Sequence, residues 1–333
     1  MTIKNNQKIY LDISWRALVK IAVFVVGVYF LFLLKNILLI LTVAIFLSIL
    51  SSPPVDFLEK KKIPRTLATF LVFLLFLGVF GGVLGAVFPI AKNEITDFGK
   101  DFPQILDNFI IFLKDLFPSN SLDLTQISKE ASTVLANVFS ATFKILGGIV
   151  SFVLILVLAF YLTVEQKSLE DFLNFFLSKN KTQNILKVYQ KVKENVSRWF
   201  AGQMFLCFVI FLLTYLVLSF LKIKYAFLLA LIAGILEAVP YIGPLLSGIL
   251  IILVAFSNSP EKVLWVILAM YLIQQTENHI LVPKVMEKFL GLSPVVVILA
   301  ISIGSTLFGF WGILLAVPFS AAISIILKEI YSS

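Results

Sequence analysis

Long apolar stretches dominate the pattern of hydrophobic and polar positions along this chain. Residues 67–90 contain no charged side chain, and a helix of about 20 apolar residues is long enough to cross a bilayer. The other stretches of comparable character are residues 15–34, 37–52, 145–164, 203–221 and 263–282. The pattern therefore predicts an all-α, polytopic integral membrane protein with about six full transmembrane helices.

Two further regions alternate apolar and charged positions at helical spacing. In residues 92–144, Ile95 and Phe98 begin a series at intervals of three and four, which is typical of an amphipathic helix, and Pro118 ends the first pattern. Residues 165–200 repeat this spacing. We expect helices that rest on the membrane or on the bundle. The chain thus divides into 1–91 (three transmembrane helices), 92–144 (extracytoplasmic), 145–164 (a transmembrane helix), 165–200 (cytoplasmic) and 201–333 (a transport region).

The positions of the basic residues predict the topology. The formal net charge is +8, but the lysines and arginines gather in short loops such as 60–65. Loop lysines of this kind mark the cytoplasmic side rather than a nucleic-acid surface, and no nucleic-acid partner is expected. A tight turn at residues 35–36 would place the basic residues before the first span and those at 60–65 together on the cytoplasmic side. Both termini are then cytoplasmic. Lys222 and Lys224 lie outside, which departs from the rule that loop lysines and arginines stay on the cytoplasmic side.

Composition narrows the class of protein. Hydrophobic residues make up 60% of the chain and the mean hydropathy is +1.02, more apolar surface than a soluble core can hide. With one histidine and one cysteine, neither a metal site nor a cofactor is expected. The sequence contains no HExxH, GxSxG or Walker A motif, so we do not expect an enzyme.

Two apolar segments are interrupted by residues that break helices. Residues 225–256 contain the sequence PYIGP, and residues 292–327 are broken at 304–306 and 309–312. Each half is too short to cross a bilayer, so we expect two opposed re-entrant hairpins with tips near the midplane. Paired interruptions of this kind indicate a transporter's binding site, although kinked spans that merely pack on neighbours are the alternative.

The candidate binding residues lie at these interruptions and on the intervening span. They are Glu237, Pro240, Tyr241, Gly243 and Pro244 in the first, Gln275 and Asn278 on the span, and Phe308, Gly309 and Gly312 in the second. An acid this deep in a membrane segment is by default functional. For Glu237 a purely structural role at the tip stays open as well. His279 is interpreted as an interfacial hydrogen-bonding residue.

The chain resembles the autoinducer-2 exporter family of bacterial membrane proteins. The resemblance runs from the first span to the end and is carried by EAVPYIGPLLSGI, QQTENHILVPK and GLSP, with Pro283 and Pro294 as structural positions. It implies export of a small furanone-type signalling molecule across the inner membrane. It also implies a homo-oligomer, reported as pentameric, whose two hairpins move by an elevator mechanism. One branch of the family is described as sodium or lithium/proton antiporters.

Three functions are therefore weighed. The leading one is a secondary exporter of a small polar organic molecule. The second is a monovalent cation/proton antiporter that uses Glu237 or Glu277, although the sequence displays no paired aspartates for cation exchange. The third is a membrane scaffold without transport. Partners common to the first two are a small solute or ion and the lipid bilayer.

Overall fold

A computed structural model describes residues 15–116, 149–165, 174–286 and 293–332, and this part of the chain is helical without a β-strand. Four of its helices are long and apolar enough to cross a membrane. The protein is thus an all-α polytopic membrane protein, as predicted. The second amphipathic pattern expected before residue 144 lies outside the described residues.

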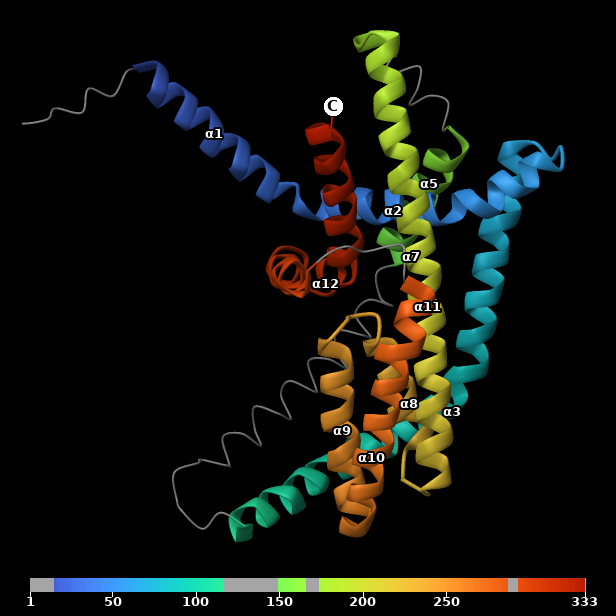
Figure 1. The fold of residues 1–333 in the computed structure, drawn as a ribbon, viewed down its shortest axis with the longest axis vertical. Coiled ribbons are helices and arrows are strands. Elements are labelled where there is room, and N and C mark those ends of the chain that lie inside the picture. The colour runs from blue at the N-terminus through green and yellow to red at the C-terminus, as the bar shows by residue number, and fades with distance from the viewer. Residues whose placement is uncertain (1–14, 117–148, 166–173, 287–292, 333) are drawn as a thin grey trace, which may run out of the picture.

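The N-terminal helices are joined by a bend rather than by the tight turn expected at residues 35–36. Helix α1 (Trp15–Leu33) leads through Leu34 into α2 (Lys35–Lys60). The Leu34 N–H donates to Phe30 O at 3.0 Å, and the Leu38 N–H donates to Leu34 O at 2.9 Å, so helical hydrogen bonding continues across the junction. Figure 1 shows α2 lying across the long helices, with α1 projecting away from them. The expected turn is therefore wrong, because no glycine or proline interrupts the hydrogen bonds here.

Two long helices each combine two segments that the sequence analysis assigned to different regions. Helix α3 (Arg65–Leu116) unites the third span with the first amphipathic pattern, and α7 (Lys179–Phe220) unites the second amphipathic region with the fifth span. Pro89 lies inside α3 and removes a helical hydrogen bond. Figure 1 shows that α3 changes direction and then runs across the end of the bundle. The domain boundaries at residues 91 and 200 therefore mark changes of composition, not ends of helices.

A first core, here called the hairpin core, surrounds two short helices. Helices α8 (Ala226–Leu236) and α9 (Ile242–Asn258) form a helical hairpin, and α10 (Pro260–Thr276) packs beside it (Figure 1). The far part of α3 and the second half of α7 complete this core. Its fully buried side chains include Leu218, Leu228, Leu229, Ile251, Val254 and Val266. The amphipathic face of α3 thus covers the hairpin.

A second group of clusters, here called the collar core, forms around α2. It contains α5 (Ile149–Val164), the beginning of α3 and α12 (Pro294–Ser332). The first half of α7 joins it through Trp199, which packs with Val297 and Val317 of α12. Among the described elements, α3 and α7 contribute to both cores. The molecule is therefore built as two packed units that share two long helices.

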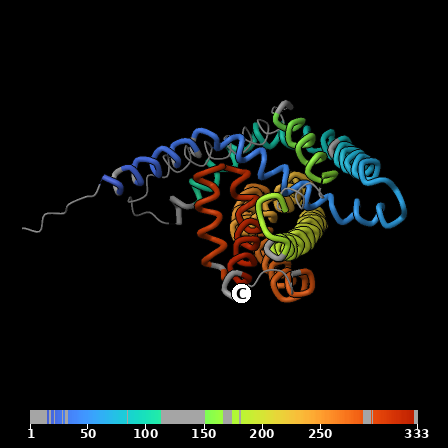
Figure 2. The backbone as a smooth tube through the Cα atoms, turned by 90° about the horizontal axis from the view of Figure 1, so that it is seen from above, coloured from blue at the N-terminus to red at the C-terminus, as the bar shows by residue number. Residues whose placement is uncertain are grey.

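Helix α12 is two helices that fold back on each other. Gly309 has φ 59° and ψ −134°, a left-handed conformation that favours glycine, and the helix breaks there as predicted. A Cβ atom on Gly312 would collide with the carbonyl oxygen of Gly304, and one on Gly304 with that of Gly312. The two glycines thus permit direct backbone contact between the halves. Figure 2 shows this second hairpin to one side of α7.

Charged groups hold the ends of several collar helices together. Arg65 Nη1 donates to Asp56 at 3.0 Å and to Glu59 at 2.6 Å, and Arg65 Nε donates to Thr163 O at 2.8 Å. Lys193 Nζ of α7, which is almost fully buried, lies 3.0 Å from Asp56. This network links α2, α3, α5 and α7 where each leaves its apolar stretch.

A second polar contact ties α3 to the beginning of the hairpin. Lys224 Nζ and Tyr225 Oη each donate to Asp101 Oδ2 at 2.5 Å, and Leu228 N–H donates to Glu94 at 2.7 Å. The Lys224 ammonium, helped by the Tyr225 hydroxyl, holds the pKa of Asp101 below its ordinary value. The contact therefore persists at neutral pH and is lost only on strong acidification, as the carboxylate is protonated.

The glycine contact in α12 predicts a specific mutational effect. Gly312→Ala should destabilise the purified protein by about 1–3 kcal/mol, because the new methyl group forces the two halves apart. Denaturant unfolding in detergent micelles measures this. Gly81→Ala is the control, since no atom lies within 4 Å of its added Cβ. Equal stability of the two variants would contradict the close approach.

Candidate functional site

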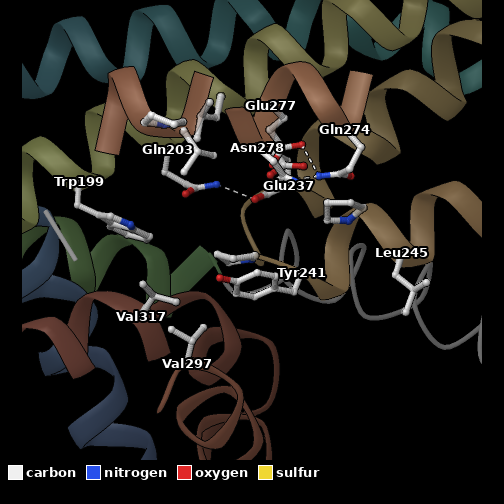
Figure 3. A pocket seen from close by; sticks show the side chains of 15 residues that line it. Trp199, Gln203, Glu237, Tyr241, Leu245, Gln274, Glu277, Asn278, Val297 and Val317 are labelled. Carbon is white, nitrogen blue, oxygen red and sulfur yellow. Dashed lines mark hydrogen bonds between the residues drawn. The ribbon is translucent and has the colours of Figure 1, made fainter. Parts of the chain in front are cut away.

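One cavity lies where the hairpin core meets the collar core. Its volume is about 650 Å³, within the range of small-molecule sites. The hairpin core supplies one wall, made by the turn between α8 and α9 and by the end of α10. The collar side supplies Trp199, Val297 and Val317. Figure 3 shows these two sets of side chains across from each other.

The turn between α8 and α9 is strained and tightly packed. Tyr241 has φ 67° and ψ −47°, and Ile242 N–H donates to Pro240 O at 2.8 Å, which together define a rare form of γ-turn. Gly243 follows, and a Cβ atom there would collide with Leu236 O at the end of α8. The strain is held by packing, an arrangement that tends to occur at functional sites. It leaves Tyr241 60% exposed at the cavity.

The end of α8 is stabilised by a side chain from α7. Gln203 Nε2 donates to the backbone carbonyl of Glu237 at 2.6 Å, and Gln203 is only 4% exposed. A helix end leaves carbonyl groups without helical partners, and in apolar surroundings each needs a donor. The two helices also approach closely, since a Cβ atom on Gly234 would lie 2.8 Å from Cys207 O. Gln203 thus replaces the water that would otherwise solvate the broken helix.

Glu277 lies opposite Glu237 in the cavity wall. It begins a π-helical turn, η1 (Glu277–Leu281), which continues into α11 (Val282–Met286). Pro283 has no N–H for the usual helical acceptor, and a wider turn before it accommodates the loss. Glu237 and Glu277 are 3% and 6% exposed, and their carboxyl groups lie within hydrogen-bonding reach of each other. Gln274 Nε2 donates to Glu277 at 3.1 Å (Figure 3).

The structure brings together part of the residue set expected from the sequence. Glu237, Pro240, Tyr241, Pro244, Asn278 and Pro283 line the cavity. Gly243 lies just behind the turn and shapes it. Gln275 is not among the lining residues, and its backbone carbonyl contacts the His279 ring at 3.1 Å.

The tip of the second interruption lies elsewhere. Neither Phe308 nor Gly309 nor Gly312 lines the cavity, and the neighbouring Trp311 packs on α5 and α2 in the collar core. Helix α12 reaches the cavity instead through Val297 and Val317, which lie within its two halves. The direct contact between Gly304 and Gly312 explains this, because it turns the tip toward the collar. Pro294 begins α12 and is likewise not among the lining residues.

Several lining residues were not proposed as binding residues from the sequence, and the polar or aromatic ones among them are Trp199, Gln203, Gln274 and Glu277. Glu277 was considered only as an exchanging acid, and its pairing with Glu237 was not foreseen. Gln203 begins an apolar run, and its polar side chain there was the available signal. No local pattern distinguishes Trp199, whose place depends on how α12 packs.

The arrangement suits a small solute rich in hydrogen-bond donors. Two carboxyl groups and the amides of Gln203, Gln274 and Asn278 supply acceptors, and the aromatic rings supply apolar faces. Among the described residues, no group of three histidine, cysteine, aspartate or glutamate side chains could hold a metal ion. Hydroxyl or ammonium groups are the complementary chemistry.

This chain is similar to known transport proteins along most of its length. A family model described as AI-2E family transporter matches residues 18–332. The putative transport protein YueF of Bacillus subtilis is 26% identical over 287 residues, covering 81% of this chain and 78% of that protein. The putative permease PerM of Escherichia coli is 26% identical over 331 residues, covering 93% and 92%. The AI-2 transport protein TqsA of Escherichia coli is 25% identical over 297 residues, covering 86% and 84%.

The contact between Gln203 and the end of α8 can be tested by stability. Gln203→Leu should cost about 1–3 kcal/mol, because it leaves the Glu237 carbonyl buried without a donor. The matched control is Gln190→Leu, which removes an exposed bond to Glu194 and should change stability by less than about 0.5 kcal/mol. Denaturant titration of both variants decides the matter. A Gln203→Leu variant as stable as its control would show that the bond is not needed.

Proposed function

Because this chain belongs to the AI-2E transporter family, we propose that it is a secondary membrane transporter that exports a small polar organic molecule resembling autoinducer-2. The observation that carries the proposal is the cavity of about 650 Å³, lined by two buried acids and three side-chain amides. A solute with several hydroxyl groups could exchange its hydration shell for these fixed groups. The name of one relative, an AI-2 transport protein, supports this class of cargo.

The position of the cavity supports alternating access. It lies between the two cores, which meet where Val239 of the α8–α9 turn packs on the α12 cluster, and α3 and α7 are the described helices that contribute to both. Movement of the hairpin core along the collar core would open the cavity first to one side and then to the other. We propose an elevator-type movement of this kind. The moving unit then contains α8, α9 and α10, while α12 packs with the collar, so the expectation that both hairpins travel together is revised.

The membrane, the orientation in it and the oligomeric state are proposed from the sequence. We place the protein in the cytoplasmic membrane of a bacterium, with α3 extending outside. Both termini are placed in the cytoplasm from the basic residues near them, because the tight turn expected at residues 35–36 does not form. Exposed apolar side chains along α1 and the first part of α3 offer surface to lipid or to further copies of the chain. A homo-oligomer, pentameric by resemblance to the family, is consistent with that surface.

One observation favours a second function, monovalent cation/proton antiport. Glu277 faces Glu237, so the cavity contains the pair of acids that the sequence alone did not display. Two carboxylates can exchange a proton for sodium or lithium. In inside-out vesicles, a pH change evoked by either cation, without flux of an organic solute, would establish this function in place of export. The scaffold hypothesis predicts neither signal, and no feature of the cavity supports it.

The export hypothesis predicts the effect of one substitution. Glu237→Gln should reduce AI-2 uptake into inside-out vesicles about 10- to 100-fold, because a hydrogen bond to a charged acceptor, which contributes about 1.5–3 kcal/mol, is replaced by a weaker one to a neutral amide. Its size-exclusion profile should not change. Glu261→Gln, which alters an exposed acid at the start of α10, serves as the control. A Glu237→Gln protein that fails to assemble would favour the structural role of this residue at the tip.

The topology is tested by cysteine labelling in a Cys207→Ser background. A cysteine at Lys100, on the exposed surface of α3, should react with a membrane-impermeant maleimide in intact cells. A cysteine at Lys61, in the loop between α2 and α3, should react only after permeabilisation. The reverse pattern would overturn the proposed orientation.

A further inference from the structure

The carboxyl group of Glu237 is the most deeply buried acid in the cavity, and it is short of partners. Its residue is 3% exposed, and the described hydrogen bonds include one to its backbone carbonyl but none from a donor to its carboxyl oxygens. Glu277, 40 positions later in the chain, is the group that faces it (Figure 3). The two acids reach this contact from separate elements, the end of α8 and the beginning of η1.

A direct contact between two carboxyl groups requires a hydrogen atom. Two bare carboxylates repel each other, and this repulsion grows where water is excluded. One proton placed between them converts repulsion into a hydrogen bond with a charged acceptor, which is a strong form of the interaction. The contact between the two acids is therefore explained if the pair holds a single proton and one negative charge.

Among the described residues, those that line the cavity include no lysine, arginine or histidine that could replace this proton. The groups that face the pair are Gln203 and Cys207 from α7, Gln274 and Asn278 from α10 and η1, and Tyr241 from the turn. The valines of α12 complete the wall. None of the salt bridges among the described residues involves Glu237 or Glu277. His279, the one histidine of the sequence, contacts the Gln275 carbonyl instead.

The pair is also open to exchange. Both acids line the cavity, so a proton can leave to water or solute from that side. The hydroxyl groups of a bound solute would donate to the same oxygens that share the proton. Solute and proton therefore compete for one pair of acceptors.

We propose that Glu237 and Glu277 form the proton-coupling site of the transporter, exchanging one shared proton for one molecule of solute. This inference rests on the proposed function and adds the coupling ion and its carrier. With the cavity open to the cytoplasm, solute binds and the proton passes to water. With the cavity open to the outside, solute leaves and the pair takes up a proton. Inward proton flow thus drives outward solute flow, with one proton and one solute exchanged per cycle.

The first test needs no solute. Infrared spectra of the purified protein at neutral pH should contain the carbonyl stretching band of a protonated carboxyl group, with the amplitude of one group. The band should be lost in the double variant Glu237→Gln/Glu277→Gln and retained in Glu261→Gln. A band that survives in the double variant, or no band in the unaltered protein, overturns the proposal.

The second test remains available if the double variant fails to fold. Calorimetry with AI-2 in two buffers of different ionisation enthalpy counts the protons released on binding. We expect one proton per AI-2 for the unaltered protein, with affinity falling about tenfold per pH unit on acidification, and no proton release by Glu277→Gln. Equal proton release by both proteins overturns the coupling site. Absence of any AI-2 binding would refute the proposed cargo, while the infrared result still decides the shared proton.

Discussion

Backbone hydrogen bonding in apolar surroundings is the constraint on which the rest of this structure depends. A helix that ends inside a membrane leaves carbonyl and N–H groups that lipid cannot satisfy. Here Gln203 donates to the carbonyl of Glu237, and Gly243 lets the following turn lie directly against the end of α8. These contacts permit a helix break in apolar surroundings, where a break is otherwise costly. The break in turn places an acid and a strained tyrosine at the wall of a cavity.

The helix break lies at the boundary between the two cores, where it forms part of the cavity wall. The hairpin core contributes the polar wall of the cavity, and the collar core contributes an aromatic and aliphatic wall. A binding site at the boundary between separately packed units is exposed or covered by their relative position. Among the described residues, no salt bridge joins a basic side chain to Glu237 or Glu277, and the two acids face each other at the cavity wall. Burial and the absence of a described counter-charge thus act together on one pair of residues.

The sequence predicted the helical class, the two interruptions and most of the turn at the cavity, because proline and glycine act on the chain locally. It did not predict the pairing of Glu237 with Glu277. That contact depends on the rotation of α10 against α8, and the π-helical turn at Glu277 shifts the register that regular spacing would suggest. It also misplaced Phe308, Gly309 and Gly312, since a glycine-rich tip resembles a binding turn whether it faces a cavity or a neighbouring helix. The contact of Gly304 with Gly312 turns this tip toward the collar core.

The central claim is that a small solute binds between the two acids and the aromatic wall. The most direct measurement is a structure of the purified protein determined at saturating AI-2 and compared with one determined without it. We predict additional density in the cavity, within hydrogen-bonding distance of Glu237 or Glu277 and beside Tyr241. Density for AI-2 that appears only at another place, with these side chains unchanged, would contradict the claim.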